Sequence, residues 1–180
     1  GLLALMLLHH SRRSARLGAQ GELIVLAEQD RSIWDKRAIN EGLALVEKAL
    51  HMRHVGPYQI QAAISALHAR APSAAATDWL QIAGLYGELR RRADSPIVQL
   101  NHAVASGMAL GPQSGLNLLA QLGDTLNDFA PYHLARADML RRLGQAATAR
   151  AAYYTALDLT QNTVESEFIR SQLAALGPGG

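Results

Sequence analysis

The side chains with the greatest chemical capacity gather between residues 30 and 35. Asp30, Arg31, Trp34 and Asp35 bring two carboxylates, a guanidinium and an indole into one short segment. Such a group can dock a polar partner through charge-assisted hydrogen bonds. The same residue types also collect where a helix begins, because an aspartate caps the first turn and a buried indole N–H needs an acceptor. We favour the capping interpretation and keep the four residues as a candidate interaction patch.

Histidine could supply a second kind of chemistry, metal binding. His51 and His54 are three residues apart, a spacing that brings two side chains to one face of a helix. No carboxylate lies at a matching spacing, so a zinc ligand set is incomplete. His9 and His10 point to different sides of a helix and do not complete one either. We expect neither a metal nor another cofactor.

Catalysis has little support in the sequence. Cysteine is absent, which excludes thiolate nucleophiles and disulfides. Ser114 lies between Gly111 and Gly115, but this motif misses the spacing of a nucleophile elbow by one residue. No recognisable motif pairs a nucleophile with a base. We therefore expect a protein that is not an enzyme.

Charge is distributed unevenly, but mildly, along the chain. Residues 1–92 carry 12 Lys and Arg against 8 Asp and Glu, whereas residues 93–180 carry 5 against 7. This polarity is too weak to indicate nucleic-acid binding by itself. We interpret the arginine clusters as solvated faces. The clusters are Arg12, Arg13 and Arg16; Arg90, Arg91 and Arg92; and Arg141 and Arg142.

The elements that must position these side chains are helices. Alanine and leucine dominate and β-branched runs are few, which favours an all-α fold. Apolar periodicity and helix stop signals predict helices over residues 2–17, 33–53, 58–70, 78–92, 96–110, 113–122, 131–143, 145–159 and 163–176. The expected N-cap residues are Asp30 or Ser32, Thr77, Ser95 and Thr163.

Three shorter segments carry expectations of their own. The run at residues 2–8 is apolar all round, so we expect it to be buried on most sides. It is too short to span a bilayer. Residues 23–26 fit either an extended segment or a helical turn. Residues 123–130 are expected to form a polar connector.

The rest of the chain is organised around residues 131–176. Gly144 is a helix stop, and small residues at Ala137 and Ala149 mark a close helix crossing, with Tyr153 four residues later. This pattern resembles a tetratricopeptide (TPR) hairpin followed by a capping helix. The preceding residues 96–122 match it at an offset of 34, the TPR period. The matched pairs are Ala103 with Ala137, Gly115 with Ala149, and Leu119 with Tyr153.

The TPR resemblance implies antiparallel helix pairs in a right-handed superhelix with a C-terminal capping helix. It groups residues 1–176 into a single domain and leaves a disordered tail at 177–180. The parts of that domain are the N-terminal helices and loop at 1–56, helical hairpins at 57–130, and the hairpin with its capping helix at 131–176.

A second resemblance is carried by short motifs that follow one another along the whole chain. They are Leu2 to His9, Gly21 to Leu23, Glu28 to Ser32, Trp34-Asp35, Gly56 to Ile64, Thr77 to Trp79, Leu85-Tyr86, Ser95-Pro96, Leu100-Asn101, Ala103 to Ala105, and Arg141 to Gly144. Together they resemble the C-terminal extension of a group of bacterial extracytoplasmic-function RNA polymerase sigma factors. In that group a TPR-like helical domain follows the promoter-reading domains.

This resemblance implies a cytoplasmic protein of transcription initiation with a regulatory role. Its partners would be core RNA polymerase and the sigma domains upstream, with promoter DNA reached only through those domains and no membrane involved. An exposed end of the helical array would also permit a homodimer. The candidate protein-interaction residues are Asp30, Arg31, Trp34, Asp35, Tyr58, Gln61, Asn101 and Arg136.

The alternative is a free-standing TPR-type adaptor. Its concave face would hold an extended peptide on helix residues such as Asn101, Arg136 and Met139. An enzyme on a helical scaffold ranks behind both.

Overall fold

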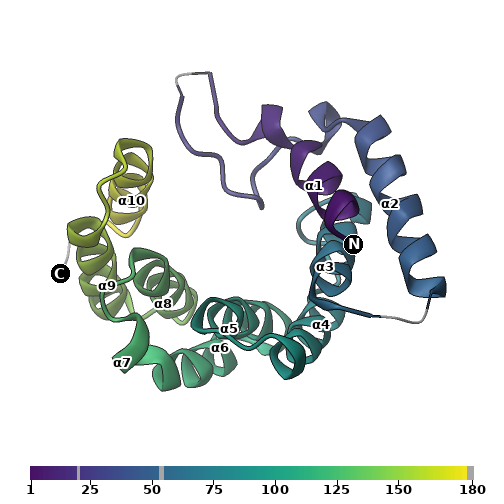
Figure 1. Ribbon diagram of the computed structural model, residues 1–180. Helices are drawn as coiled ribbons and strands as arrows, with labels where there is room; N and C mark the ends of the chain where they lie inside the picture. Colours follow the sequence, from purple (N-terminus) through teal and green to yellow (C-terminus); the bar gives the residue numbers. More distant parts are fainter. Residues whose placement is uncertain (20, 53–54, 178–180) are drawn as a thin grey trace. The chain divides into compact units, whose positions relative to one another are not determined.

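A computed structural model describes residues 1–19, 21–52 and 55–177, and all its regular elements are helical (Figure 1). The α-helices are α1 (Leu2–His10), α2 (Lys36–His51), α3 (Pro57–Arg70), α4 (Trp79–Arg92), α5 (Pro96–Leu110), α6 (Pro112–Leu119), α7 (Gly123–Leu126), α8 (Ala130–Arg142), α9 (Ala146–Leu159) and α10 (Thr163–Ala175). The 3₁₀ turns are η1 (Arg13–Ala15), η2 (Arg31–Ile33) and η3 (Ala120–Leu122). The all-α prediction is confirmed for the described residues.

The chain divides into two compact units, Gly1–Asp94 and Ser95–Gly180. The single domain expected over residues 1–176 stays a prediction. The expected tail falls largely on residues 178–180, which lie outside the described part of the chain, and Arg53 and His54 lie outside it as well.

In the first unit, α1 packs against α2 and α3, and α3 packs against α4. Its core joins Ala4 and Leu8 of α1 to Val46 of α2 and to Ala62 and Ala66 of α3. These side chains come from three helices that are spaced along the sequence by loops, so this core depends on contacts between distant segments.

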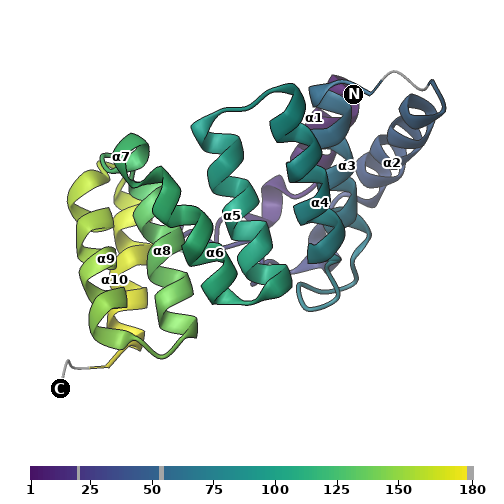
Figure 2. The same ribbon diagram turned by 90° about the horizontal axis from the view of Figure 1, so that it is seen from below.

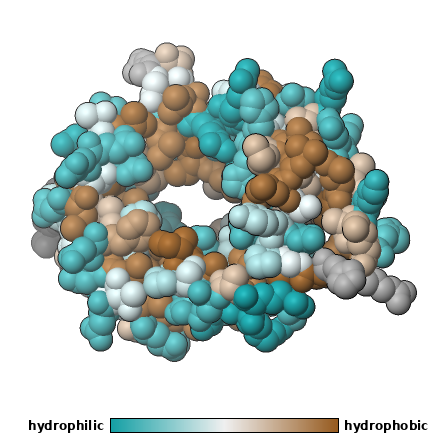
Figure 3. Space-filling model, viewed as in Figure 1, coloured by the Kyte–Doolittle hydropathy of each residue, from teal (hydrophilic) through white to brown (hydrophobic). Residues whose placement is uncertain are grey.

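The expectation that residues 2–8 are buried on most sides is wrong. Leu2, Leu3 and Met6 are between 50% and 59% exposed, whereas Ala4 and Leu8 are buried. The helices that pack against α1 are α2 and α3, and the exposed side of α1 carries apolar side chains at the surface (Figure 3).

In the second unit, α5 pairs with α6 and α8 pairs with α9, and α6 also packs against α8 (Figure 2). The first helix of each pair begins at Pro96 and Ala130, and the second at Pro112 and Ala146, so both starts are separated by 34 residues. α10 packs on α9 behind the second pair. The offset expected from the sequence therefore recurs in the helix boundaries.

Small residues allow the helices of the second unit to approach closely. Ala103, Ala137 and Ala149 are all fully buried, as expected for close crossings. The helices approach even more closely at Gly115, because a Cβ on this residue would lie 3.0 Å from the Cα of Gly107.

Met139 fills the space beside this glycine crossing. A Cβ on Gly107 would lie 2.7 Å from the Met139 sulfur, and Met139 is 1% exposed. The expectation that Met139 lines an open peptide-binding face is therefore wrong, because the gap left by the two glycines draws its flexible side chain into the core.

Glycines also make the turns within both pairs. Gly111 alone joins α5 to α6, at φ 103°. Gly144 follows α8 at φ 75°, with its N–H donating to Arg141 O at 3.0 Å and that of Gln145 donating to Leu140 O at 3.0 Å. These two bonds form a Schellman motif, which a left-handed residue makes possible.

Some predicted boundaries are corrected by capping. α1 ends at His10, not near residue 17, and the Ser11 hydroxyl donates to Leu8 O at 2.8 Å. α2 begins at Lys36 rather than residue 33, since Asp35 caps it. The N-cap residues of α4 and α10 are Asp78 and Asn162 instead of the expected Thr77 and Thr163. Aspartate and asparagine are better N-caps than threonine, which explains both shifts.

The segment between η3 and α8 is more ordered than a polar connector. It contains the single-turn α7, and Leu126 of that turn is buried. The apolar run at residues 23–26 forms no helix, and Leu23 instead makes an isolated bridge with Leu17.

Candidate functional site

The two aspartates of the candidate patch act as caps. Asp30 Oδ1 accepts the Ser32 N–H at 2.8 Å, and Asp35 Oδ1 accepts the Ala38 N–H at 3.0 Å. Hydrogen bonds from Ser32 hold the pKa of the Asp30 carboxyl below its usual value. The capping interpretation of these two residues is confirmed, although both side chains remain exposed.

Arg31 is held at the end of α3. Its Nη1 donates to the carbonyls of His68 and Ala71, the latter at 2.8 Å. Its guanidinium carbon also lies 4.7 Å from the centre of the Trp34 ring. The last carbonyls of a helix lack partners and carry partial negative charge, so a guanidinium is favoured there.

Trp34 is buried, but its polar atom is left without a partner. The side chain is 4% exposed, and its Nε1 has no hydrogen-bond acceptor among the described residues. The sequence predicts a buried indole and a partner for its N–H. The burial is confirmed, and the partner is missing.

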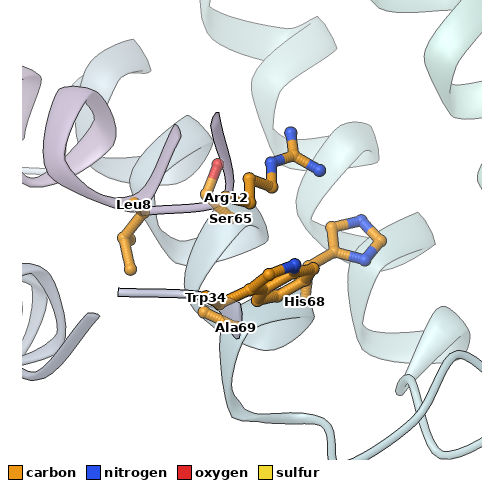
Figure 4. A pocket seen from close by; sticks show the side chains of 6 residues that line it. All are labelled: Leu8, Arg12, Trp34, Ser65, His68 and Ala69. Atoms are coloured by element: carbon orange, nitrogen blue, oxygen red, sulfur yellow. The ribbon is translucent and has the colours of Figure 1, made fainter. Parts of the chain in front are cut away.

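The indole lines a small pocket in the first unit (Figure 4). The residues around it are Leu8, Arg12, Trp34, Ser65, His68 and Ala69. Its volume is about 10 Å³, which is space for about one water-sized group. The Trp34 nitrogen lies on the ring edge that faces the side chains of Arg12 and His68 (Figure 4).

Two histidines extend the polar side of the pocket. His9 Nε2 lies 3.2 Å from Ser65 Oγ, within hydrogen-bond distance. The His68 ring meets the Trp79 ring edge-on, with centroids 5.2 Å apart. His68 Nδ1, like the Trp34 indole, is buried with no hydrogen-bond partner among the described residues.

The charged groups that influence His68 and Arg12 are all of positive sign. Burial, and after it the charges of Arg12, Arg31 and His9, lower the pKa of His68 to about 4. Burial and the neighbouring arginines Arg16 and Arg31 also lower the pKa of the Arg12 guanidinium. None of the groups that set these pKa values is a carboxylate. Cationic groups are therefore gathered without a counter-charge in the described part of the chain.

Sequence reasoning missed Arg12, Ser65 and His68. Arg12 was interpreted as part of a solvated face, yet it is half-buried. A weak signal existed, because Ser65 and His68 share one face of a helix at a spacing of three. That they face Arg12 and Trp34 follows only from the packing of α1 on α3.

The other predicted interaction residues do not join this pocket. Tyr58 is 52% exposed near the start of α3 and Gln61 lies one turn later. Arg31 contacts the other end of that helix, roughly 15 Å along its axis from Tyr58. Asn101 on α5 is exposed and Arg136 on α8 is half-buried, both in the second unit. Whether any of them contacts a protein stays a prediction.

The described residues offer neither a metal-ligand cluster nor a membrane-spanning helix. Among them no group of three or more His, Asp or Glu side chains could hold a metal ion. His51 Nδ1 lies 2.8 Å from Glu47 O, and its expected companion His54 is outside the described residues. No helix in that part of the chain has both the length and the apolar character needed to cross a bilayer.

Comparison with known proteins gives a partial match. Residues 1–50 match a family model described as "Family of unknown function (DUF6596)". This segment contains Arg12 and Trp34 of the pocket but not Ser65 or His68.

A curated relative extends the similarity to nearly the whole chain. "Uncharacterized protein R00370" of Rhizobium meliloti (strain 1021) is 46% identical over 173 residues, which is 96% of this chain and 41% of that protein. The chain thus spans about two fifths of the length of the relative it matches. No solved structure matches the chain.

Proposed function

We propose that the chain is the C-terminal regulatory domain of an RNA polymerase sigma factor and acts in the cytoplasm in transcription initiation. The observation that carries this proposal is the ordered set of motifs from Leu2 to Gly144 that resembles such extensions. The curated relative adds support, because sequence of this kind occurs there within a much longer chain.

The proposed mechanism is contact between the helices and either the sigma domains or core polymerase. Exposed side chains on α3 and α5, such as Tyr58 and Asn101, are available for such contacts. In this proposal the pairs α5–α6 and α8–α9 are successive TPR-like repeats of a right-handed superhelix, and α10 is the capping helix. The 34-residue step between their helix starts supports that assignment.

A binding titration against core RNA polymerase tests the proposal. The 180-residue chain is titrated alone and together with any sequence its gene encodes ahead of residue 1. Binding that depends on the upstream part supports an intramolecular regulator. A gene that encodes no promoter-binding helices, or binding in neither form, would overturn it.

Matched variants separate a specific surface from general charge. Tyr58→Ala and Asn101→Ala remove exposed side chains at candidate positions. Arg170→Ala removes an exposed charge on another helix, α10. The proposal expects at least one of the first two to weaken binding by about tenfold, as for an interface residue of moderate energy, while the Arg170 variant binds as the parent does.

A peptide-binding adaptor is the second candidate, and the recurrence of 34 residues in the helix starts favours it. Its face would use Asn101 and Arg136, without the buried Met139. Screening of a peptide pool tests it. Affinity that Arg136→Ala abolishes would support the adaptor, and no affinity for any peptide would exclude it.

A further inference from the structure

The pocket between α1, α3 and Trp34 is the place in the described structure where unpartnered donors and uncompensated cations meet. Trp34 Nε1 and His68 Nδ1 are both buried without a hydrogen-bond partner there. A buried N–H that has lost its contact with water costs stability unless an acceptor is supplied. An indole nitrogen can only donate, so what Trp34 lacks is an acceptor.

We propose that this pocket binds one oxyanion group, a carboxylate or a phosphate, which accepts the Trp34 N–H inside and faces the Arg12 guanidinium at the mouth. The shared chemistry is an acceptor oxygen that carries negative charge. The cavity of about 10 Å³ admits one such oxygen, and the remaining oxygens then lie toward the arginine.

Arg12 is the cation available for this role. Arg31 already donates to two carbonyls at the end of α3, and Arg16 donates to His9 O at 3.0 Å. The Arg12 guanidinium makes no hydrogen bond or ion pair with the described residues. A guanidinium with its donors free offers the paired N–H groups that carboxylate and phosphate recognise.

The surroundings favour an anion over a single water. Water would satisfy the indole but would leave the cations of the cluster facing one another. An anion satisfies the N–H and also offsets the positive charge of Arg12 and Arg31, two groups that lie close enough to His68 to lower its pKa beyond the effect of burial. Ser65 Oγ and His68 Nδ1 line the same space and can donate further bonds.

The inference is independent of the proposed function, so either can fail without the other. The probes are sodium phosphate and sodium acetate, each compared with sodium chloride at matched ionic strength. Binding is read from the indole N–H resonances of the ¹⁵N-labelled chain, assigned with Trp79→Phe. A saturable shift of the Trp34 resonance is expected with phosphate, acetate or both, and the responding probe identifies the oxyanion.

Matched variants test the role of Arg12. Arg12→Gln is expected to weaken binding by at least about tenfold, because it removes a charge-assisted contact. Arg13→Gln makes the same change at the neighbouring exposed position and is expected to stay within about twofold of the parent, as for a screened surface charge. Equal losses in the two variants would mean general attraction to the basic segment and would overturn the proposal.

A second readout covers the case in which a variant folds poorly. Phosphate or acetate should raise the melting temperature of the parent chain and of Arg13→Gln, but not that of Arg12→Gln or Trp34→Phe. Phenylalanine keeps an aromatic ring at this position and removes the N–H donor together with the rest of the pyrrole ring. No saturable shift of the Trp34 resonance with either anion, or the same shift with chloride, would show that the pocket holds water and not an oxyanion.

Discussion

Arg141 and Arg150 of the α8–α9 hairpin differ from Arg12 of the pocket beside α3 in whether the chain supplies the guanidinium with an acceptor. In the hairpin, Arg141 pairs with Asp138 at 2.6 Å and Arg150 donates to the carbonyl of Gly177. Beside α3, Arg12 is half-buried with no acceptor in the described structure, and His68 lies near it. Arg141 and Arg150 have acceptors within the chain, whereas the Arg12 guanidinium has none among the described residues. Donors that find acceptors within the chain need no ligand. A half-buried guanidinium and a buried indole N–H that both lack an acceptor point to one.

The two regions should therefore fail in different ways when they are changed. The second unit depends on close approach between helices, so added atoms should damage it most. The pocket is defined by positive charge and by hydrogen-bond donors that lack acceptors. A change of pH or the removal of a charge should therefore affect it most.

The largest effect is expected from Gly115→Leu. The side chain would have to enter a space where even a Cβ lies 3.0 Å from the Gly107 backbone and 3.1 Å from Ala103 O. Overpacking of this kind costs about 3 kcal/mol, and backbone neighbours cannot move aside. Urea unfolding measures the loss. A midpoint equal to that of the parent would show that α5 and α6 do not cross here.

A pH effect of the next size is expected from His68. Its pKa is about 4 in the folded chain and near 6.5 when unfolded, so the unfolded chain takes up the proton first. The contribution of neutral His68 is therefore complete above pH 6.5 and is lost as the pH falls toward 4, by about 2–3 kcal/mol in total. His9, whose pKa is also lowered, adds a loss of the same sign.

Urea titrations across this pH range check the prediction with two variants. His68→Gln should flatten the dependence of stability on pH, because glutamine does not titrate. His10→Gln makes the same change at an exposed histidine on α1 and serves as the control substitution. A parent chain with constant stability between pH 6.5 and 4 would contradict the burial of His68 among cations.

An intermediate effect is expected at the alanine crossing of α8 and α9. Ala137→Leu and Ala149→Leu should each lower the free energy of unfolding by about 1–3 kcal/mol, because both positions are fully buried. Chemical denaturation measures both. Unchanged midpoints for the two variants would place the crossing elsewhere.

The smallest effect, and of opposite sign, is expected at Gly84. A Cβ there meets no atom within 4 Å, so Gly84→Ala should stabilise α4 by about 0.5–1 kcal/mol through helix propensity. This variant is also the control for Gly115→Leu, since both add atoms to a helical glycine. Destabilisation by Gly84→Ala would mean that α4 has a neighbour at this face.

Much of the helical pattern could be predicted because its signals are local. Ser95-Pro96 and Gly144 mark boundaries through backbone conformation and capping, which depend on a few adjacent residues. The 34-residue step was readable for the same reason, since small residues recur at fixed positions. The errors at Thr77 and Thr163 arose because a better capping residue stood next to each of them.

The pocket could not be predicted in the same way. Arg12, Trp34 and His68 are far apart in the sequence, and only the packing of α1 and η2 on α3 brings them together. The identity of Trp34 as a buried indole was accessible, but the absence of its acceptor was not. The prediction for Met139 was wrong for a related reason, because the direction of its side chain depends on two glycines more than twenty residues away.

The single-residue turn at Gly111 has a consequence for the order in which the chain folds. Two helices joined by one residue meet with almost no loop entropy to overcome, so α5 and α6 can associate as soon as they form. The pocket instead needs contacts such as that of His9 with Ser65, which are 56 residues apart. Pulsed hydrogen exchange should therefore show α5 and α6 protected first, and the oxyanion pocket assembled among the last parts of the chain.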